Sequence, residues 1–231
     1  MRQIILDTET TGLDPAHGHR IVEIGCVEML NRRFTGNNFH HYLDPERDSD
    51  EAALEVHGLT REFLSGKPKF AVVAAELLAF IKGAQIIIHN APFDLAFLDA
   101  ELARLKLPAF RTQVDSVIDS LVMAKEAHPG KRNNLDALCD RYGVSNAQRT
   151  LHGALLDSTL LAEVYLAMTR GQNGLMMDQG DGDLLQTASE ELSGPLESFV
   201  VTANADEVAA HAALLGSIAK EARKPAVWGA M

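Results

Sequence analysis

The stretch Ile4-Ile5-Leu6-Asp7-Thr8-Glu9-Thr10-Thr11-Gly12 joins an aliphatic run to two acids and ends in a glycine. The aliphatic run predicts a buried strand. Because side chains alternate across a strand, Asp7 and Glu9 are expected on the same face. Two buried carboxylates repel each other, and a hard divalent cation such as Mg²⁺, which prefers oxygen ligands, relieves that repulsion. The stretch therefore predicts a metal site at the end of a core strand, with two solvated acids as the plainer alternative.

The bulk composition sets limits on the class of protein. The chain has 231 residues, 46% of them hydrophobic, which is enough for one large domain with an appendage. It contains no run of about 18 apolar residues, so we expect no membrane span. The first strand begins too near Met1 to leave room for a signal peptide. Cys26 and Cys139 are expected as buried thiols of a cytoplasmic protein. The net charge of −11 argues against a broad basic groove for long duplex DNA.

The apolar pattern predicts an α/β fold in which a mixed sheet carries helices. In addition to the opening stretch, strands are expected at residues 20–30, 33–43, 85–88 and 114–117, and helices at 49–56, 70–81, 92–105, 120–127, 134–142 and 153–168. The first three strands are expected to form an antiparallel meander, and the later strands alternate with helices. These elements place residues 1–170 in one domain.

The rest of the chain is predicted to be a linker and a small tail. Residues 171–194 hold five glycines and few large apolar residues, which is typical of a flexible linker. In residues 195–231, Phe199-Val200-Val201 predicts a short strand, and the residues from 204 onward predict one helix. One strand and one helix are too little to bury a core. We therefore expect the tail to fold onto a partner; docking back onto its own domain is the alternative.

Acids recur at two later positions of the chain. Asp94 lies where the strand at 85–88 has ended and a helix begins, a place that also suits a helix N-terminal acid. Asp157 lies at the edge of an apolar helix face, where a carboxylate without a partner is costly. His152 precedes Asp157 by five positions. The two side chains can therefore converge only if His152 lies in the loop that enters the helix, a bend that Gly153 permits.

Four acids are thus expected to meet at the end of the central strand: Asp7, Glu9, Asp94 and Asp157. Acids in this arrangement can hold two metal ions about 3.5–4 Å apart, which clamp the attacking and leaving oxygens of a phosphodiester. An imidazole titrates near neutral pH, so His152 is the candidate that takes the proton of the attacking water. Asp119 and Asp136 stand at predicted helix starts and are interpreted as caps.

The three acid motifs resemble those of the DEDD exonuclease family, histidine subclass. The resemblance rests on Asp7-Thr8-Glu9-Thr10-Thr11-Gly12, on His89-Asn90-x-x-Phe93-Asp94 and on His152-x-x-x-x-Asp157, in this order. It covers residues 1–170 and implies an RNase H-like fold with a mixed five-stranded sheet, and 3′→5′ exonuclease activity. It also implies that the four acids bind two Mg²⁺ or Mn²⁺ ions and that His152 is the general base.

Five further residues are expected near the substrate. The resemblance implies that Thr10, Thr11 and Gly12 place backbone groups against the terminal nucleotide, although a tight turn alone explains Gly12. His57 is expected in the pocket for the terminal base. Asn90 is expected at the substrate or as the residue that fixes the loop before the third acid.

A narrower resemblance is to the epsilon (proofreading) subunits of bacterial DNA polymerase III. It rests on residues 27–39, 131–138 and 149–157 and on the tail from Phe199 to Trp228, while the linker departs from that family in length and composition. It implies a bacterial cytoplasmic enzyme that trims the single-stranded or frayed 3′ end of DNA, with a small accessory (theta) subunit as one partner. A free-standing 3′→5′ exoribonuclease of the same family and a non-catalytic tether between polymerase and clamp are the alternatives.

Two partner-binding segments are expected from that resemblance. The tail is expected to bind the catalytic (alpha) subunit of polymerase III through the short strand, through apolar residues at helical spacing and through the one tryptophan. These residues are Val200 in the strand, Val208, Leu215 and Ile218 in the helix, and Trp228. The linker contains a weak match to the short motif that binds the sliding clamp, with two methionines where an aromatic residue is common: Gln172, Leu175, Met176 and Met177.

Overall fold

The computed structural model describes residues 1–147, 149, 151–170 and 204–222. The chain divides into two compact units, Met1–Met177 and Asp178–Met231. Several predictions fall outside the described residues: the linker at 171–194 with its clamp motif, the strand at 199–201 with Val200, and Trp228. The domain boundaries at 170 and 194 therefore stay a prediction.

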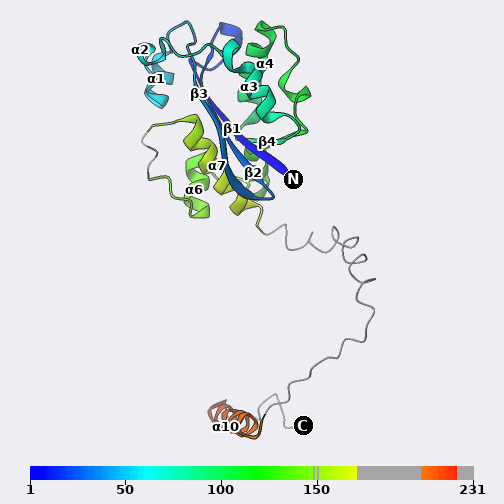
Figure 1. Ribbon diagram of the computed structural model, residues 1–231. Helices are drawn as coiled ribbons and strands as arrows, with labels where there is room; N and C mark the ends of the chain where they lie inside the picture. The colour runs from blue at the N-terminus through cyan, green and yellow to red at the C-terminus, as the bar shows by residue number, and fades with distance from the viewer. Residues whose placement is uncertain (148, 150, 171–203, 223–231) are drawn as a thin grey trace, which may run out of the picture. The chain divides into compact units, whose positions relative to one another are not determined.

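The first unit is built on a mixed five-stranded sheet in the order β3-β2-β1-β4-β5 (Figure 1). Its strands are β1 (Arg2–Thr10), β2 (Ile21–Leu30), β3 (Arg33–Tyr42), β4 (Gln85–Ile88) and β5 (Ser116–Asp119). The strands β1, β2 and β3 pair antiparallel, whereas β4 pairs parallel to both β1 and β5. The predicted mixed sheet is therefore confirmed, with the opening stretch of the sequence in its central strand.

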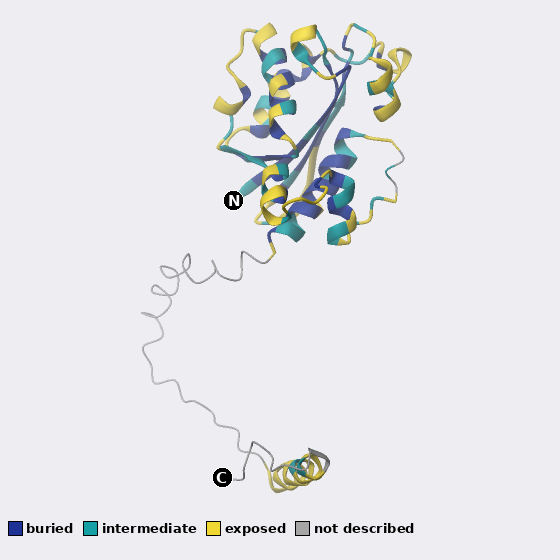
Figure 2. Ribbon diagram, turned by 180° about the vertical axis from the view of Figure 1, so that it is seen from behind, coloured by how far each residue is buried: buried dark blue, intermediate teal, exposed yellow. Residues whose placement is uncertain are grey.

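Helices cover both faces of this sheet. They are α3 (Phe70–Ile81), α4 (Ala91–Arg104), α5 (Ser120–Ala127), α6 (Leu135–Tyr142) and α7 (Ala154–Met168). Ile4 and Leu6 of β1 pack in one core cluster with α3 and α4, while Ile5 packs on the opposite face with α5, α6 and α7. Figure 2 shows the buried residues concentrated in the strands and on the inner faces of the helices. Because both faces of the central strands are covered, their sequences are continuous apolar runs.

Two details of the fold differ from the sequence-based expectation. The strand expected at 114–117 lies at Ser116–Asp119, because its pairing with β4 begins only where Ser116 stands opposite Gln85. The segment before it contains the short 3-10 helix η2 (Phe110–Thr112). The sequence also gave no indication of α2 (Arg61–Leu64), whose four residues are too few to show an apolar period. Thr60 caps α2 by accepting a hydrogen bond from the backbone N–H of Phe63.

Short elements surround the end of β1 and later form part of the site. The 3-10 helix η1 (Pro15–His17) follows β1 along the chain. The helix α1 (Glu51–His57) is tied to the end of β1 because the backbone N–H of Asp50 donates to the carbonyl of Thr11 at 2.8 Å. It ends at Gly58, which adopts a left-handed φ of 70° that suits glycine.

The described part of the second unit is the helix α10 (Ala205–Ala222). Asn204 caps it, since its side-chain oxygen accepts from the backbone N–H groups of Asp206 and Glu207. Val208 and Ile218 are exposed and Leu215 is half-buried, so the apolar stripe predicted from the sequence is present on a helix. Within the described residues, no helix has the length and apolar character needed to cross a membrane.

Candidate active site

The site begins with the two acids of β1 and the close approach of α7. Asp7 lies opposite Gly25 of β2 in the antiparallel register, and Glu9 lies two residues further along β1. A Cβ added at Gly25 would lie 2.2 Å from the backbone nitrogen of Leu155, so only a glycine lets α7 approach this closely. This contact brings the first turn of α7, and with it Asp157, against the acids of β1.

The five residues predicted to carry the chemistry line one cavity of about 300 Å³: Asp7, Glu9, Asp94, His152 and Asp157. Ligand atoms of Glu9, His152 and Asp157 lie within 4.8 Å of one another, which is close enough for them to share a metal ion. Asp94 is held by Thr8, whose backbone N–H and hydroxyl donate to Oδ1 at 3.1 and 2.8 Å. The structure therefore brings all five residues together from β1, α4, α7 and the loop that precedes α7.

His152 reaches the cavity from the loop before α7. Its backbone N–H donates to the carbonyl of Val56 in α1 at 3.1 Å, and the helix starts two residues later at Ala154. His152 therefore lies in the loop that enters the helix, as its spacing of five positions from Asp157 required. The bend at Gly153 does not require a glycine, because its φ of −153° is an extended conformation that other residues adopt equally well.

Three of the carboxyl groups are held in an environment that opposes ionisation. Burial, and then repulsion by Asp94 and Glu9, raise the pKa of Asp7 well above its usual value. Burial and the charge of Asp157 raise the pKa of Glu9 to about 8. Burial also raises the pKa of Asp94 to about 7, although hydrogen bonds from Thr8 favour its charged form. A cation among these groups would relieve the cost of ionising them.

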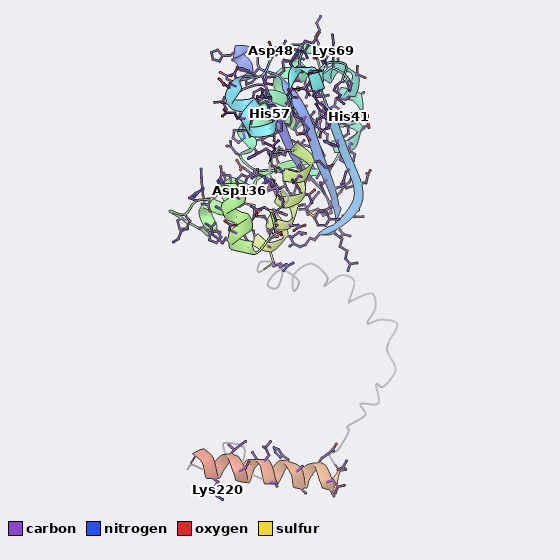
Figure 3. The ribbon with its side chains drawn as sticks, turned by 90° about the vertical axis from the view of Figure 1, so that its left-hand side faces the viewer. His41, Asp48, His57, Lys69, Asp136 and Lys220 are labelled. Carbon is purple, nitrogen blue, oxygen red and sulfur yellow. The ribbon has the colours of Figure 1, made fainter. Side chains whose placement is uncertain are left out.

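A second cavity, of about 330 Å³, adjoins the first. The two share Thr8, Glu9 and Phe93, and the second is otherwise lined mainly by small and apolar side chains of α1 and of the loop after β1. His57 of α1 lines it and is buried; its Nδ1 accepts from the backbone N–H of Leu59, and its Nε2 is buried without a hydrogen-bond partner among the described residues. Burial lowers the pKa of His57, so the neutral ring is favoured. Figure 3 marks His57 on α1.

Comparison with known proteins places this geometry in a family. The Exonuclease (RNase_T) family model matches residues 4–165. The chain is 48% identical to the DNA polymerase III subunit epsilon of Pasteurella multocida (strain Pm70), over 98% of this chain and 93% of that protein. It is 50% identical to the corresponding subunit of Escherichia coli (strain K12), over 95% of this chain and 94% of that protein. The chain belongs to the exonuclease family of the DNA polymerase III epsilon subunits.

Solved structures support the fold of this epsilon family member. A structure of Exonuclease X in complex with 5′ overhanging duplex DNA matches with a TM-score of 0.58 and 24% identity, over 74% of this chain and 93% of that one. The predicted RNase H-like fold is therefore confirmed. The family match over residues 4–165 and the epsilon relatives show that the chain is a nuclease.

The donor set of this exonuclease fits hard divalent cations. Carboxylate oxygens are the ligands that Mg²⁺ and Mn²⁺ prefer, and five carboxylates line the cavity: the four predicted acids and Asp136. A divalent ion between Asp7, Glu9 and Asp94 would favour their charged forms and so lower the raised pKa values. The residues present therefore match the chemistry of the metal ions expected from the sequence.

Arg149 also lines the cavity, and no local pattern in the sequence marks it as a site residue. Its Nε and Nη2 donate to the two carboxylate oxygens of Asp157, each at 2.6 Å. Burial opposes ionisation of Asp157, but the His152 ring and the Arg149 guanidinium beside the carboxylate outweigh burial and lower its pKa. The sequence does contain one indirect indication of this role. An acid on an apolar helix face needs a partner of opposite charge, and Arg149 precedes the helix that carries Asp157.

Asp136 is not the helix cap that the sequence suggested. Asn134 caps α6, since its side chain accepts from the backbone N–H of Ala137. Asp136 lies in the first turn of α6 (Figure 3), where its Oδ1 accepts from Arg149 and from Asn146. The interpretation of Asp119 as a cap is confirmed, because it accepts from the backbone N–H of Leu121 at the start of α5.

Only some of the other residues expected near the substrate line one of the two cavities. Thr10 and Gly12 line the second cavity and Asn90 lines the first, but Thr11 lines neither. The Thr11 side chain is fully buried, and its hydroxyl is hydrogen-bonded to His19. Gly12 is explained by the same ring rather than by a tight turn, since a Cβ added there would lie 2.3 Å from Cε1 of His19.

Proposed function

We propose that this chain is a proofreading 3′→5′ exodeoxyribonuclease of a bacterial replicative DNA polymerase. The observation that carries the proposal is the meeting of four acids and His152 in one cavity beside a second, largely apolar cavity. The relatives at 48% and 50% identity are named DNA polymerase III subunit epsilon, which favours DNA over RNA as the substrate.

Each part of the site is assigned a role in hydrolysis. Asp7, Glu9, Asp94 and Asp157 would hold two Mg²⁺ or Mn²⁺ ions, which when bound would activate a water and stabilise charge on the phosphate that is attacked. His152 takes the proton of the attacking water on its free ring nitrogen. Held by these acids, the ions would also orient the scissile phosphate for attack by the water.

The second cavity is assigned to the terminal nucleotide. Its apolar lining suits a base and sugar, and Phe93, shared by the two cavities, lies between the base and the reacting phosphate. A base enters only after it has left the duplex, which costs a few kcal/mol and costs least at a mismatch. Selectivity for mispaired ends therefore needs no hydrogen bond that reads the base.

The test is an exonuclease assay with the full-length protein and Mg²⁺. We expect release of mononucleotides from the 3′ end, faster from a mismatched than from a matched primer, and faster from DNA than from an RNA oligonucleotide of the same sequence. Asp7→Ala and Asp157→Ala should each lose at least about 100-fold in rate, because bound metal ions supply several kcal/mol of stabilisation. Asp140→Ala, which removes an exposed acid of α6, is the matched control and should keep the rate.

The outcomes separate the alternatives. A preference for RNA would favour the free-standing exoribonuclease. An inactive wild-type protein that still joins polymerase to clamp would favour the non-catalytic tether. If the variants of the acids kept more than a few percent of the activity, the metal assignment would be wrong.

The partners proposed for this chain come from the resemblance of its sequence to the epsilon subunits. We assign residues 195–231 to the polymerase catalytic (alpha) subunit, propose a small accessory (theta) subunit as a further partner, and assign the protein to the bacterial cytoplasm. Gln172, Leu175, Met176 and Met177 are assigned to the sliding clamp. A synthetic peptide of residues 170–180 should bind purified clamp weakly, and no binding at high micromolar concentration would contradict that assignment.

A further inference from the structure

Arg149 holds the same carboxylate that the proposed metal site needs. Its guanidinium binds both oxygens of Asp157 in a two-pronged pair, with each N···O distance 2.6 Å. Its side chain is only 6% exposed, so the pair is shielded from solvent. Among the described residues that line the cavity, Arg149 alone carries a permanent positive charge. It therefore compensates a cluster of acids whose other members resist ionisation.

The same guanidinium also reaches the candidate base. Nη2 of Arg149 lies 2.9 Å from Nδ1 of His152. A guanidinium has donors only, so a hydrogen bond from Arg149 requires the lone pair of a neutral imidazole on Nδ1 and its proton on Nε2. The other tautomer would direct an Nδ1 proton at Oδ2 of Asp157, which lies further away at 3.3 Å. A neutral imidazole has one such lone pair. While Arg149 is bound there, His152 has no nitrogen free to take a proton from water.

A third contact keeps Arg149 at the cavity. Its Nη1 donates to Oδ1 of Asp136 at 2.5 Å, and Asp136 is half-exposed at the cavity rim. Asn146 donates to the same oxygen at 3.2 Å and so helps to fix this acceptor. If Arg149 left Asp157, the contact with Asp136 would retain it nearby.

We propose that Arg149 is an exchangeable internal cation: it occupies Asp157 and the lone pair of His152 until a divalent ion displaces it, so that metal binding and release of the general base are one event. Arg149 is thus a positioning residue, which acts through Asp157 and His152. The inference rests on the proposed function, because it takes Asp157 as a metal ligand.

The direct test is calorimetric titration of full-length protein with Mn²⁺, without DNA. Arg149→Met keeps much of the side-chain volume but removes the competing charge. We expect it to bind Mn²⁺ more tightly by about 10- to 100-fold, because hydrogen bonds to charged groups contribute about 1.5–3 kcal/mol. Arg149→Lys, which cannot make the two-pronged pair, should fall between this variant and the wild type.

The melting temperature provides a second readout. In EDTA, Arg149→Met should melt below wild type, because Asp157 is left buried beside Glu9 without a counter-charge. In saturating Mn²⁺ the difference should shrink, since the ion then compensates the same carboxylate. Arg141→Met is the matched control: Arg141 bonds Asn133 and the carbonyl of Arg132 in the same region but does not touch Asp157. It should leave the Mn²⁺ affinity unchanged.

A nitrogen NMR spectrum of the His152 ring reports the release of the base. Without metal, wild type should show the proton on Nε2; with Mg²⁺, which is diamagnetic, the Nδ1 signal should lose its hydrogen bond to Arg149. If wild type binds no divalent ion, the proposed metal site itself fails. If wild type binds Mn²⁺ but Arg149→Met binds it equally or more weakly, only the exchange is overturned. The exchange is also overturned if the Nδ1 signal does not respond to Mg²⁺.

Discussion

At the residue scale, the protein maintains carboxyl groups that cannot all ionise together. Burial and repulsion by neighbouring acids raise the pKa of Asp7 well above its usual value and that of Glu9 to about 8, and burial raises the pKa of Asp94 to about 7. Each raised pKa means that the folded protein binds a proton more tightly than the unfolded chain does. The active site is therefore a source of instability at neutral pH that a bound cation would relieve.

This gives a pH dependence of stability with a definite sign. Glu9 releases its proton near its ordinary value of 4.5 in the unfolded chain but only near about 8 in the folded protein. Its contribution is therefore present below about pH 4.5 and is lost as the pH rises towards about 8. In EDTA, the free energy of unfolding from urea titrations should fall across this window, and saturating Mg²⁺ should reduce the slope.

Glu9→Gln is the matched variant for that measurement. Without metal it should melt a few degrees higher than wild type at about pH 7.5, since about 1 kcal/mol shifts the melting temperature of a protein this size by roughly 2–4 °C. Its stability should also depend less on pH, while its exonuclease activity is lost. Stability in EDTA that is the same at both ends of the window would contradict the raised pKa values.

His152→Ala tests the base by the pH dependence of the rate. The single-turnover rate of wild type should rise through the neutral range, where imidazole groups usually titrate. The variant should lose that limb and fall in rate by roughly 10²–10⁴-fold. His17→Ala removes an exposed histidine of η1 and serves as the control. A variant that kept the wild-type profile would assign His152 a structural role.

At the element scale, local pattern explains what could be predicted and what could not. The spacing of apolar residues predicts the strands and the helix at Phe70–Ile81. The alternation of side chains along a strand predicts that the two acids of β1 share a face. The shift of β5 depends on its pairing with β4, which no single segment encodes. The contact between Arg149 and Asp136 spans 13 positions and depends on how α6 meets the loop before α7. Such contacts arise only from the packing of elements against one another.

The packing of α7 on β2 gives a prediction at this scale. In Gly25→Ala, the new Cβ would lie 2.2 Å from the backbone nitrogen of Leu155 and 2.3 Å from the carbonyl carbon of Ala154, so α7 must move. We expect a loss of about 1–3 kcal/mol in the free energy of unfolding. Because His152 and Asp157 move with α7, the rate should also fall by about 10²-fold.

Gly153→Ala is the contrasting variant at the same helix start. Its new Cβ would lie 3.9 Å from the Glu23 carboxylate, an ordinary contact, and its backbone is extended. It should therefore cost far less stability than Gly25→Ala in the same urea titrations. Equal losses in the two variants would mean that the close approach at Gly25 does not set the position of α7.

At the scale of the whole molecule, the two units differ in how much they can bury. The first unit has a core on each face of its sheet. The described part of the second unit is one 18-residue helix with Val208, Leu214 and Ile218 exposed. An isolated helix of this length is marginal in water, because most helical stability comes from packing of an apolar face. The second unit is therefore suited to gain stability from a partner.

Deleting residues 195–231 should separate the two activities proposed for the chain. The shortened protein keeps the sheet and both cavities, so it should degrade single-stranded DNA from the 3′ end at the wild-type rate. It should no longer co-purify with the polymerase catalytic subunit. In the full chain, Val208→Asp and Ile218→Asp should weaken binding to the polymerase subunit, because each places a charge on the apolar stripe of α10. Lys220→Asp is the control: it changes an exposed residue of the same helix and should have a smaller effect. Tight binding by the shortened protein, or loss of its nuclease activity, would show that the first unit also carries the polymerase contact or depends on the tail.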